Sequence, residues 1–564
     1  MIGLVAATAA GCRHAAHLAA AWPDAKRYDG GAAALREAWA ECDGVVAFLA
    51  VGAAVRLVAP LLADKRTDPG LVCVDEAARY AVAVTGGHAG GANELAGRVA
   101  AALGAEPVVT TASDAAGSTA LDAIGWPVEG DVAAVGRALL DGEPVALVAD
   151  ATWPLPPLPL VAAGDPAAAC AVARVVVTDA ARYEAAGPVA LVRPPSLVVG
   201  LGASRGAPAG EVERLVDGAL AAAGLAPGSV ACAATVEAKA GEQGLVEACA
   251  ARGWPLVARP AAALAGVEVP HPSEVVRAAV GTPSVAEAAA LDVAGPGALL
   301  VVPKTASAMA TVAVARRRPR GRLAVVGLGP GARDLLTPRA AAELARAAHV
   351  VGLDQYVDQV RDLLRPGTTV HASGLGDEEA RARAAVGLAA AGHAVALIGS
   401  GDAGVYAMAS PALERYDGGF EVVGVPGVTA ALAAAALLGA PLGHDHCAIS
   451  LSDLHTPWHV IERRVRAAAE GDFVVTLYNP RSRARGWQLG AALDVLRAHR
   501  PDGTPVGIVR DASRPGQRVA VTTLGALGPD QLAEVDMLTV VVVGGSQTRL
   551  AGGLMVTPRG YRWA

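Results

Sequence analysis

The sequence GSGDAGVYAM at residues 399–408 decides the fold of the second half of the chain. It follows the apolar run AVALI at 394–398, which predicts a buried β-strand ending in a glycine-rich turn. In open α/β sheets, loops at the carboxyl ends of parallel strands bind ligands. The motif is not a phosphate-binding loop, because it lacks GK[ST] and has Asp402 where a phosphate needs a cation. Its glycines predict close approach of the backbone to a ligand, and the acid among them suits a ligand that is cationic or rich in hydroxyl groups. An ordinary strand–helix turn is the alternative.

A second glycine loop, GLGPG at 327–331, follows a short apolar strand predicted at 323–326. Pro330 has no backbone N–H and the spacing is not GxGxxG, so this turn is not built to wrap a pyrophosphate. Thr337 and Pro338 predict the N-cap and the first residue of a helix. Two glycine loops, each after a buried strand, therefore predict an α/β fold for this half.

These loops and three later segments carry a family resemblance. The segments are VPGVTAALAAAALLGAPL (425–442), DHCAISLSDLHTPW (445–458) and DFVVTLYNPRS (472–482). In this order they make residues 321–564 similar to the tetrapyrrole methylases, and the last two resemble the ring-contracting precorrin-3B C17-methyltransferases. The resemblance implies a fold of two subdomains, about 321–436 and 437–564, with S-adenosyl-L-methionine as cofactor. It also implies a precorrin or cobalt-precorrin substrate and a homodimer formed through this half.

The same resemblance implies a set of site residues. Those expected around the cofactor are Gly399, Gly401, Asp402, Val405, Tyr406, Thr429, Ala430, Tyr478 and Asn479, and those expected to face the macrocycle are Gly329, Pro330 and Gly331. Methyl transfer depends on in-line placement of donor and acceptor more than on a strong acid or base. Ring contraction needs acid–base help, for which Asp453 and His455 are the candidates.

Composition limits the other possibilities. The 564 residues imply three or more domains, and a hydrophobic content of 53% is ample for several cores. A net charge of −7 and an isoelectric point near 6.0 argue against nucleic-acid binding. The seven cysteines are scattered without a CxxC pair, which favours a reduced, cytoplasmic protein. The longest apolar stretch, 425–442, contains glycine and proline, so no membrane span is expected.

The first half shows an α/β pattern, with strands predicted at 2–6, 44–49 and 71–75 between alanine-rich helical runs. Three polar islands interrupt it: Lys65 with Asp68-Pro69, GGHAGGAN at 86–93, and VVTTASD at 108–114. In GGHAGGAN, four glycines surround His88 just before a helical run at 95–103, which places a helix N-terminus near the histidine. A loop histidine with a purely structural role is the alternative.

Further islands follow a looser, proline-rich segment. They are GLGASRG (200–206) after a strand from 196, TVEAKAGEQGL (235–245), and Glu287 with Lys304. On a helix, Lys239 and Glu242 are expected to form an ordinary surface pair. Together the islands make residues 1–316 similar to the cobalt-precorrin-5A hydrolases, with α/β domains of a lactone hydrolase at 1–125 and 196–316 and a connecting domain at 126–195. The glycine loop of that family usually reads GxGC, whereas this chain has Ala203 in place of the cysteine.

The resemblance of the first half implies opening of a δ-lactone with release of acetaldehyde. Water must be activated and an oxyanion stabilised. His88 is the expected base, and Lys65 or Lys239 the expected cation. The whole chain is thus predicted to be a bifunctional enzyme of cobalamin biosynthesis. The alternative is a methylase acting on another tetrapyrrole, with a non-catalytic scaffold in the first half.

Two other patterns leave alternatives open. The basic run ARRRPRGR at 315–322 is typical of a solvated linker, or it attracts a polycarboxylate that passes between two sites. Histidines 444, 446, 455 and 459 have a spacing that metal sites use. Since they lie within the segment that resembles the methylases, we expect no resident metal there.

Overall fold

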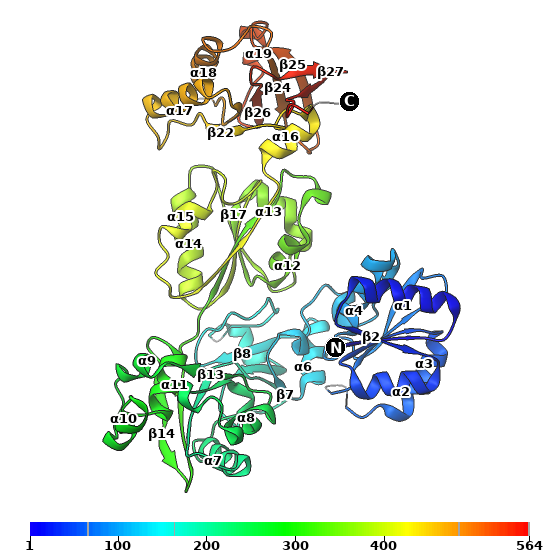
Figure 1. The fold of residues 1–564 in the computed structure, drawn as a ribbon, viewed down its shortest axis with the longest axis vertical. Helices are drawn as coiled ribbons and strands as arrows, with labels where there is room; N and C mark the ends of the chain where they lie inside the picture. Colours follow the sequence, from blue (N-terminus) through cyan, green and yellow to red (C-terminus); the bar gives the residue numbers. More distant parts are fainter. Residues whose placement is uncertain (65–66, 163, 483–484, 562–564) are drawn as a thin grey trace. The chain divides into compact units, whose positions relative to one another are not determined.

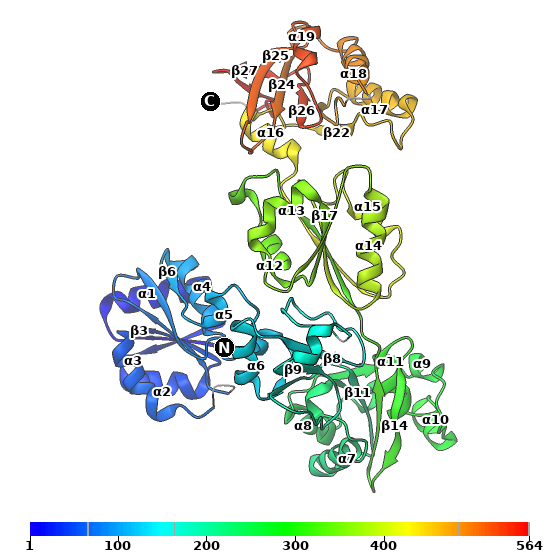
Figure 2. The same cartoon turned by 180° about the vertical axis from the view of Figure 1, so that it is seen from behind.

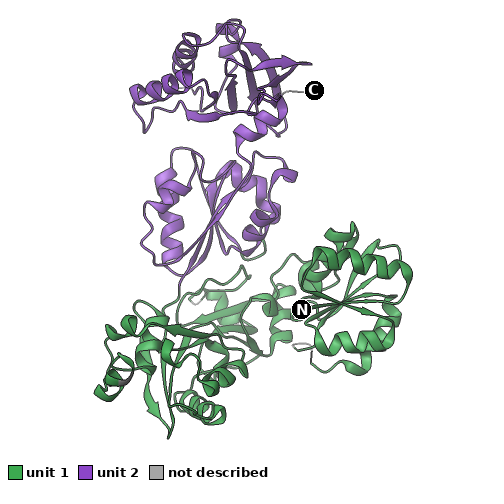
Figure 3. Cartoon of the chain, viewed as in Figure 1, with its two compact units in different colours: residues 1–319, 365–367 green, residues 320–364, 368–564 purple. Residues whose placement is uncertain are grey.

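The computed structural model describes residues 1–64, 67–162, 164–482 and 485–561, and the chain divides into two compact units. Unit 1 comprises residues 1–319 and 365–367, and unit 2 comprises residues 320–364 and 368–564 (Figure 3). Both units are mixed α/β structures, which confirms the fold class at this level. Within the described ranges, no helix is both long and apolar enough to cross a membrane.

Unit 1 begins with a six-stranded sheet whose neighbouring strands pair in parallel except β4 and β5. Its order is β2 (Ala25–Asp29), β1 (Ile2–Ala6), β3 (Gly44–Phe48), β4 (Gly70–Val74), β5 (Tyr80–Thr85), β6 (Glu106–Val108). The helices are α1 (Ala9–Ala21), α2 (Ala32–Glu41), α3 (Val51–Val58), α4 (Ala92–Leu103) and α5 (Ala112–Ala115). Helices α1 and α4 cover one face and α2 and α3 the other, so the sheet is buried on both sides (Figure 1).

Two further sheets complete unit 1. The four-stranded sheet has the order β7 (Val128–Gly130), β10 (Val189–Val192), β9 (Ala173–Val177), β8 (Val145–Ala149), with helix α6 (Val132–Leu140). The five-stranded sheet has the order β13 (Leu256–Arg259), β12 (Val230–Val236), β11 (Leu197–Ala203), β15 (Ala310–Arg316), β14 (Leu299–Ala306). Its helices are α7 (Ala209–Ala222), α8 (Gln243–Ala250), α9 (Ala261–Ala265), α10 (Glu274–Val280) and α11 (Ala286–Ala294). The segment predicted as a connector therefore has its own sheet and hydrophobic core.

Unit 2 begins with five parallel strands in the order β18 (Thr369–Ser373), β17 (His349–Leu353), β19 (Ala394–Gly399), β16 (Arg322–Gly327), β20 (Glu421–Val425). The helices are α12 (Pro338–Arg346), α13 (Asp354–Val360), α14 (Glu378–Ala390) and α15 (Ala409–Leu413). Helices α12 and α13 lie on one face and α14 and α15 on the other, as both views show (Figures 1 and 2). The central strands β19 and β16 end at the two glycine loops.

The remainder of unit 2 is built on a mixed sheet with the order β22 (His446–Ser450), β23 (Val474–Tyr478), β26 (Thr539–Val543), β24 (Pro505–Arg510), β25 (Arg518–Thr523). A small sheet joins β21 (Gly439–Ala440), β28 (Leu554–Val556) and β27 (Arg549–Ala551). The helices are α16 (Ala430–Leu438), α17 (Trp458–Glu470), α18 (Gln488–Arg497) and α19 (Pro529–Ala533). The subdomain boundary predicted at 436–437 falls inside α16, so a helix rather than a loop connects the two sheets.

The predicted strands and the predicted helix cap agree with the structure. Strand β1 has the predicted bounds, and β19 is buried along its whole length. Thr337 is the N-cap of α12, and its hydroxyl accepts a hydrogen bond from Ala340 N. Local sequence chemistry is sufficient for these features because each depends on apolar runs or on a few adjacent residues.

The basic run at 315–322 contains the boundary between the two units, and its end residues are anchored by ion pairs. Arg316 at the end of β15 pairs with Asp179 at 2.7 and 2.8 Å. Arg322 at the start of β16 forms a bidentate pair with Glu343 at 2.5 and 2.8 Å, and these bonds raise the pKa of Arg322. The run therefore connects the two units, as a linker does, while the arginines at its ends anchor the strands on which they lie.

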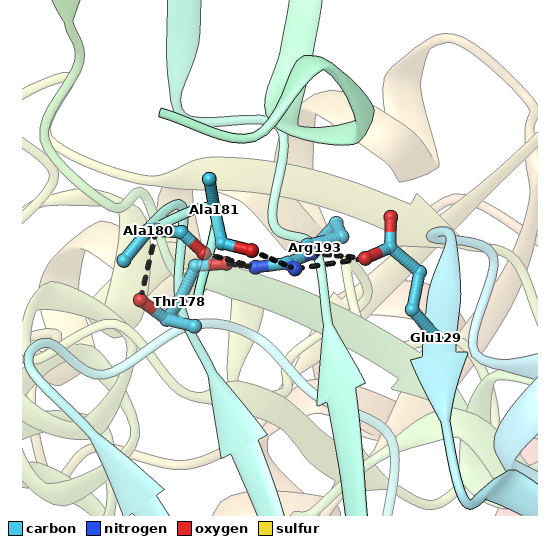
Figure 4. Close-up of polar contacts among 5 residues, drawn as sticks. All are labelled: Glu129, Thr178, Ala180, Ala181 and Arg193. Atoms are coloured by element: carbon cyan, nitrogen blue, oxygen red, sulfur yellow. Dashed lines mark hydrogen bonds and ion pairs between the residues drawn. The ribbon is translucent and has the colours of Figure 1, made fainter. Parts of the chain in front are cut away.

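The four-stranded sheet contains a buried arginine whose guanidinium is fully used (Figure 4). The Arg193 side chain is 1% exposed, and its Nε and Nη2 donate to Glu129 Oε2 at 3.1 and 2.8 Å. Its Nη1 donates to the carbonyl oxygens of Ala180 at 2.5 Å and Thr178 at 3.3 Å. The arginine therefore satisfies carbonyl groups of the segment that follows β9.

We expect Arg193→Met to lower the free energy of unfolding of unit 1 by about 2–3 kcal/mol, because buried carbonyl oxygens lose their donors. Denaturant unfolding of the full chain measures this free energy. Limited proteolysis across the unfolding transition shows which of the two units unfolds. The control is Arg182→Met at an exposed position nearby, which should change stability by less than about 0.5 kcal/mol. Equal effects of the two substitutions would contradict the proposed role of Arg193.

Candidate active site

Three loops meet where the central strands of unit 2 end. Gly329 and Gly401 exchange two backbone hydrogen bonds, N to O, of 3.0 and 2.7 Å. A Cβ atom on Gly427, which follows β20, would lie 2.1 Å from the carbonyl oxygen of Gly401. The glycines were expected to allow close approach to a ligand. For Gly427 the close approach is instead between backbones of neighbouring loops, which only glycine permits, whereas Gly401 has a φ of 65° that favours glycine.

Asp402 joins two of these loops through its carboxylate. Oδ1 accepts a hydrogen bond from Gly404 N at 2.8 Å, and Oδ2 accepts one from Gly427 N at 3.0 Å. Each carboxylate oxygen has two lone pairs, so both oxygens can still accept a hydrogen bond from a ligand. Asp402 therefore both positions the loops and presents negative charge to the cavity beside them.

One cavity brings together most of the residues predicted to surround the cofactor. The lining includes Gly401, Asp402, Val405, Tyr406, Thr429, Ala430, Tyr478 and Asn479. Pro330, predicted to face the macrocycle, lines the same cavity. Gly399, Gly329 and Gly331 belong to the same loops but do not line it. Residues from both sheets of unit 2 thus form one site.

Tyr406 and Tyr478 form the wall of this cavity between the two larger sheets of unit 2. The Tyr478 hydroxyl lies 2.6 Å from Thr429 Oγ1 and accepts a hydrogen bond from Ala431 N at 2.8 Å, which caps the first turn of α16. Tyr406 donates to the Ala448 carbonyl at 2.8 Å, and burial raises the pKa of its phenol. The Tyr406 phenol therefore stays neutral, and the hydrogen bonds of both tyrosines hold the wall in place.

The backbone around the cavity is strained. Tyr406, Asn479 and Asp511 have φ values of 51°, 48° and 49°, in the left-handed region that non-glycine residues seldom adopt. All three residues line the cavity. Strained conformations persist where the surrounding structure enforces them, and they cluster at functional sites.

Arg514 is a site residue that the sequence interpretation missed. Its Nε donates to the Pro330 carbonyl at 2.5 Å, and its Nη2 donates to Ser400 Oγ at 2.9 Å. It thereby links the loop after β24 to both glycine loops and adds a cation to the lining. The signal was present, because RPG at 514–516 is a turn with a basic residue after a buried strand.

Asp453, the candidate acid–base group, does not line this cavity. Its Oδ2 accepts a hydrogen bond from Nε2 of the buried Gln488 at 2.9 Å. Its catalytic role stays a hypothesis. Among the described residues, no group of three or more histidine, cysteine, aspartate or glutamate side chains is placed to hold a metal ion.

In unit 1, His88 lies in a polar cluster beside a second cavity. Its Nε2 is 2.8 Å from Ser113 Oγ and 3.3 Å from Asp114 Oδ2. Asp114 Oδ2 also accepts hydrogen bonds from Asn93 Nδ2, at 2.9 Å, and from the Thr111 hydroxyl. A carboxylate accepts hydrogen bonds, so the ring nitrogen that faces it carries the proton. This tautomer leaves Nδ1 of His88 as a proton acceptor, as in a base oriented by an aspartate.

The two other residues predicted for this half do not join His88. Lys239 ends a 3-10 turn (Glu237–Lys239) and pairs with Glu242 at 3.2 Å just before α8, so the pair does not lie on one helix as expected. Lys239 lines a different cavity from His88. Lys65 lies outside the described residues.

The donor set of the unit 2 cavity fits S-adenosylmethionine. Val405, Val509 and Val540 offer apolar contact for an adenine ring, while Asp402 offers acceptors for hydroxyl or ammonium groups. The negative charge of Asp402 suits a cationic sulfonium compound. The lining of this cavity therefore fits the cofactor in charge and polarity, and the role of each residue stays a prediction.

Comparisons with known proteins divide the chain in the same way. Residues 322–528 match the family model of the tetrapyrrole (corrin/porphyrin) methylases. Residues 33–114 match the model of the cobalamin synthesis G N-terminal region, and residues 197–315 match that of the cobalamin synthesis G C-terminus.

Individual relatives cover the second half. A probable cobalt-factor III C(17)-methyltransferase of Salmonella typhimurium is 47% identical over 242 residues, which are 42% of this chain and 99% of the relative. A precorrin-3B C(17)-methyltransferase of a Sinorhizobium species is 46% identical over 255 residues, which are 43% of this chain and 98% of the relative. The crystal structure of the methyltransferase CobJ is 43% identical, has a TM-score of 0.40, and covers 42% of this chain and 100% of that one.

Unit 2, with its two sheets and the glycine loops at their shared cavity, is thus a methylase of the tetrapyrrole class. The chain belongs to the tetrapyrrole methylase family, in which it joins a precorrin-3B C17-methyltransferase half to a half built from the cobalamin synthesis G regions. Both resemblances stated from the sequence are confirmed.

Proposed function

We propose that the chain is a bifunctional enzyme of corrin-ring biosynthesis. Unit 2 methylates C17 of precorrin-3B or cobalt-factor III and contracts the ring, and unit 1 opens the lactone of cobalt-precorrin-5A with release of acetaldehyde. The observation that carries the first activity is the convergence of three glycine loops on one cavity lined by the predicted cofactor residues. The second activity rests on the cobalamin synthesis G matches and on the His88 cluster.

In unit 2 the protein acts mainly by positioning. S-adenosylmethionine, when bound, supplies the methyl group. Asp402 and the Thr429–Ala430 turn hold it, and the Tyr406–Tyr478 wall excludes water. Arg514 forms hydrogen bonds to two loops. One contains Pro330 and is expected to face the macrocycle, and the other contains Ser400 and holds the cofactor. Fixing donor and acceptor in this way lowers the entropic part of the barrier.

In unit 1, His88 Nδ1 takes a proton from the water that attacks the lactone carbonyl. Asp114 holds the ring in the required tautomer. The carbon–oxygen bond of the lactone then breaks, leaving a carboxylate and a hydroxyl group on the two-carbon fragment. As this hydroxyl loses its proton and becomes the carbonyl of acetaldehyde, the carbon–carbon bond between the fragment and the macrocycle breaks, and the electron pair of that bond stays on the conjugated ring. The charge that develops on the carbonyl oxygen needs a cation or N–H donors.

Mass spectrometry of the products tests both activities. Cobalt-factor III or precorrin-3B with S-adenosylmethionine should gain one methyl group at C17, and cobalt-precorrin-5A should yield trapped acetaldehyde. Methylation of another tetrapyrrole would favour a different acceptor. A failure to release acetaldehyde would favour a scaffold role for unit 1.

Asp402→Ala should weaken S-adenosylmethionine binding about tenfold, because a hydrogen bond to a charged group is lost. Calorimetric titration measures the affinity, and circular dichroism checks the fold. The control is Asp417→Ala, whose carboxylate bonds only locally, to Gly419 N among the described residues. Unchanged affinity in a folded Asp402 variant would remove this residue from the site.

The family resemblance supports a further proposal, that the protein forms a homodimer through unit 2, which light scattering measures directly. The scattered cysteines support a location in the cytoplasm, which fractionation of the cells tests.

A further inference from the structure

Unit 1 has a cavity beside the carboxyl end of β11 that the proposed mechanism does not use. Gly202 and Ala203 at the end of β11 and Ser204 after it form one side, and the β14–β15 hairpin forms another. The tip of the hairpin is fixed, because Ser307 Oγ and Met309 N both donate to Glu211 Oε1, at 2.5 and 2.7 Å. The cavity therefore has well-defined walls.

Two lysines line this cavity, Lys239 and Lys304. The chain has only four lysines, Lys26, Lys65, Lys239 and Lys304, in a total of 47 basic residues. Nearly all basic residues of the chain are arginines, yet two of its four lysines line this one cavity. Lysine differs from arginine in having a compact ammonium on a flexible stem, which suits single carboxylates at variable positions.

The two ammonium groups differ in their partners. Lys239 Nζ pairs with Glu242 Oε1 at 3.2 Å. Lys304 has no ion pair within the part of the chain that the structure describes, although it is only half-exposed. A half-buried cation that lacks a counter-ion attracts an anionic ligand.

The backbone at Lys304 is held by a buried acid. Lys304 N donates to Glu287 Oε1 at 3.0 Å, and the Glu287 side chain is 0% exposed. Burial by itself raises the pKa of Glu287, but the hydrogen bonds from Lys304 N and His271 outweigh burial and lower it. Glu287 therefore stays ionised and fixes the strand from which the Lys304 side chain extends.

The rest of the cavity wall combines the hydroxyl groups of Ser204, Ser284, Ser307 and Thr311 with apolar side chains. Helix α10 contributes Val275, Val276 and Val280, and Val275 is 80% exposed. Met309 and Ala203 add further apolar surface. An exposed apolar helix face next to two cations matches a flat apolar ring that carries carboxylate groups.

We propose that this cavity binds the carboxylate side chains and one face of the tetrapyrrole on which unit 1 acts, with Lys304 as the main anchor and Lys239 as the second. The inference rests on the proposed lactone opening and assigns it a substrate-binding site that includes neither His88 nor its cluster. Lys304 binds and does not take part in bond breaking, so it affects KM rather than kcat.

The test is steady-state release of acetaldehyde from cobalt-precorrin-5A by the full chain. Lys304→Met should raise KM by about 10–100-fold with kcat changed by less than about threefold, since one charged contact is lost. Lys304→Arg should recover most of the loss, because it restores the positive charge. Added salt should raise the KM of the parent more than that of Lys304→Met.

The matched control is Lys26→Met, a surface lysine that pairs with Glu41 on the first sheet and should leave KM unchanged. Thermal unfolding shows whether Lys304→Met is folded. If it is not, the KM of Lys239→Met decides, with an increase of about tenfold expected. Parent-like KM in the folded variants would overturn the binding site while leaving the lactone-opening activity intact. Absence of acetaldehyde with the parent enzyme would instead overturn the proposed function and this inference together.

Discussion

Replacing His88 with alanine should slow acetaldehyde release from cobalt-precorrin-5A by about 10²–10⁴-fold, the usual cost of losing a general base. The reason is geometric. Asp114 and Ser113 lie at Nε2 of His88, which leaves Nδ1 to accept the proton from water. Chromatography should show the methylated, contracted lactone accumulating, while C17 methylation continues at the parent rate.

The matched control is His17→Ala, which removes an exposed histidine from α1 of the same sheet. It should leave both reactions unchanged. If His88→Ala releases acetaldehyde at the parent rate, His88 is structural and the polar cluster around it only shapes the loop. Asp114→Asn should fall between the parent and His88→Ala, because the ring remains but its tautomer is no longer enforced.

Gly427→Ala should weaken S-adenosylmethionine binding by about a hundredfold. The new methyl carbon would lie 2.1 Å from the Gly401 carbonyl oxygen and 2.8 Å from Gly327. Both neighbours are backbone, so neither can move aside as a flexible side chain would. Overpacking of this kind costs about 1–3 kcal/mol, and here the cost falls on the loops that form the cofactor cavity.

Gly424→Ala is the control for this change. Gly424 lies in β20, three residues earlier, and a Cβ there would meet nothing within 4 Å. Calorimetric titration should give parent-like affinity for Gly424→Ala and a large loss for Gly427→Ala, with thermal unfolding recorded for both. Equal affinities would mean that the loops separate at little cost and that their contact does not shape the site.

The strands, the helix cap and the family were predictable because each depends on residues close together in the chain. A run of apolar residues followed by glycine predicts a strand and a turn wherever it occurs. The site residues around Asp402 came from the resemblance, and the cavity lining agrees with most of them. Arg514 was missed because its partners, Pro330 and Ser400, are 184 and 114 residues away.

Contacts at long range refined three interpretations. The basic run at 315–322 connects the two units as its composition predicts, but Arg316 and Arg322 at its ends form ion pairs with residues of the folded units. Lys239 and Glu242 have helical spacing, yet a turn ends between them. Lys239 was grouped with His88, yet it lines a cavity with Lys304. The spacing of residues along the sequence predicts which side chains lie near one another in a single helix or strand. It does not predict which other segments pack against that helix or strand.

The sequence by itself determined the α/β class of both halves, the glycine loops that follow the central strands, and membership of the family. These follow from local periodicity, from the conformational range of glycine and proline, and from the order of the motifs. Only the tertiary structure decided what the glycines contact, that Asp402 bonds to Gly427, and that Lys239 and Lys304 meet at one cavity. The physical reason is that hydrogen bonds and close backbone contacts act over a few ångströms in space, regardless of separation along the chain.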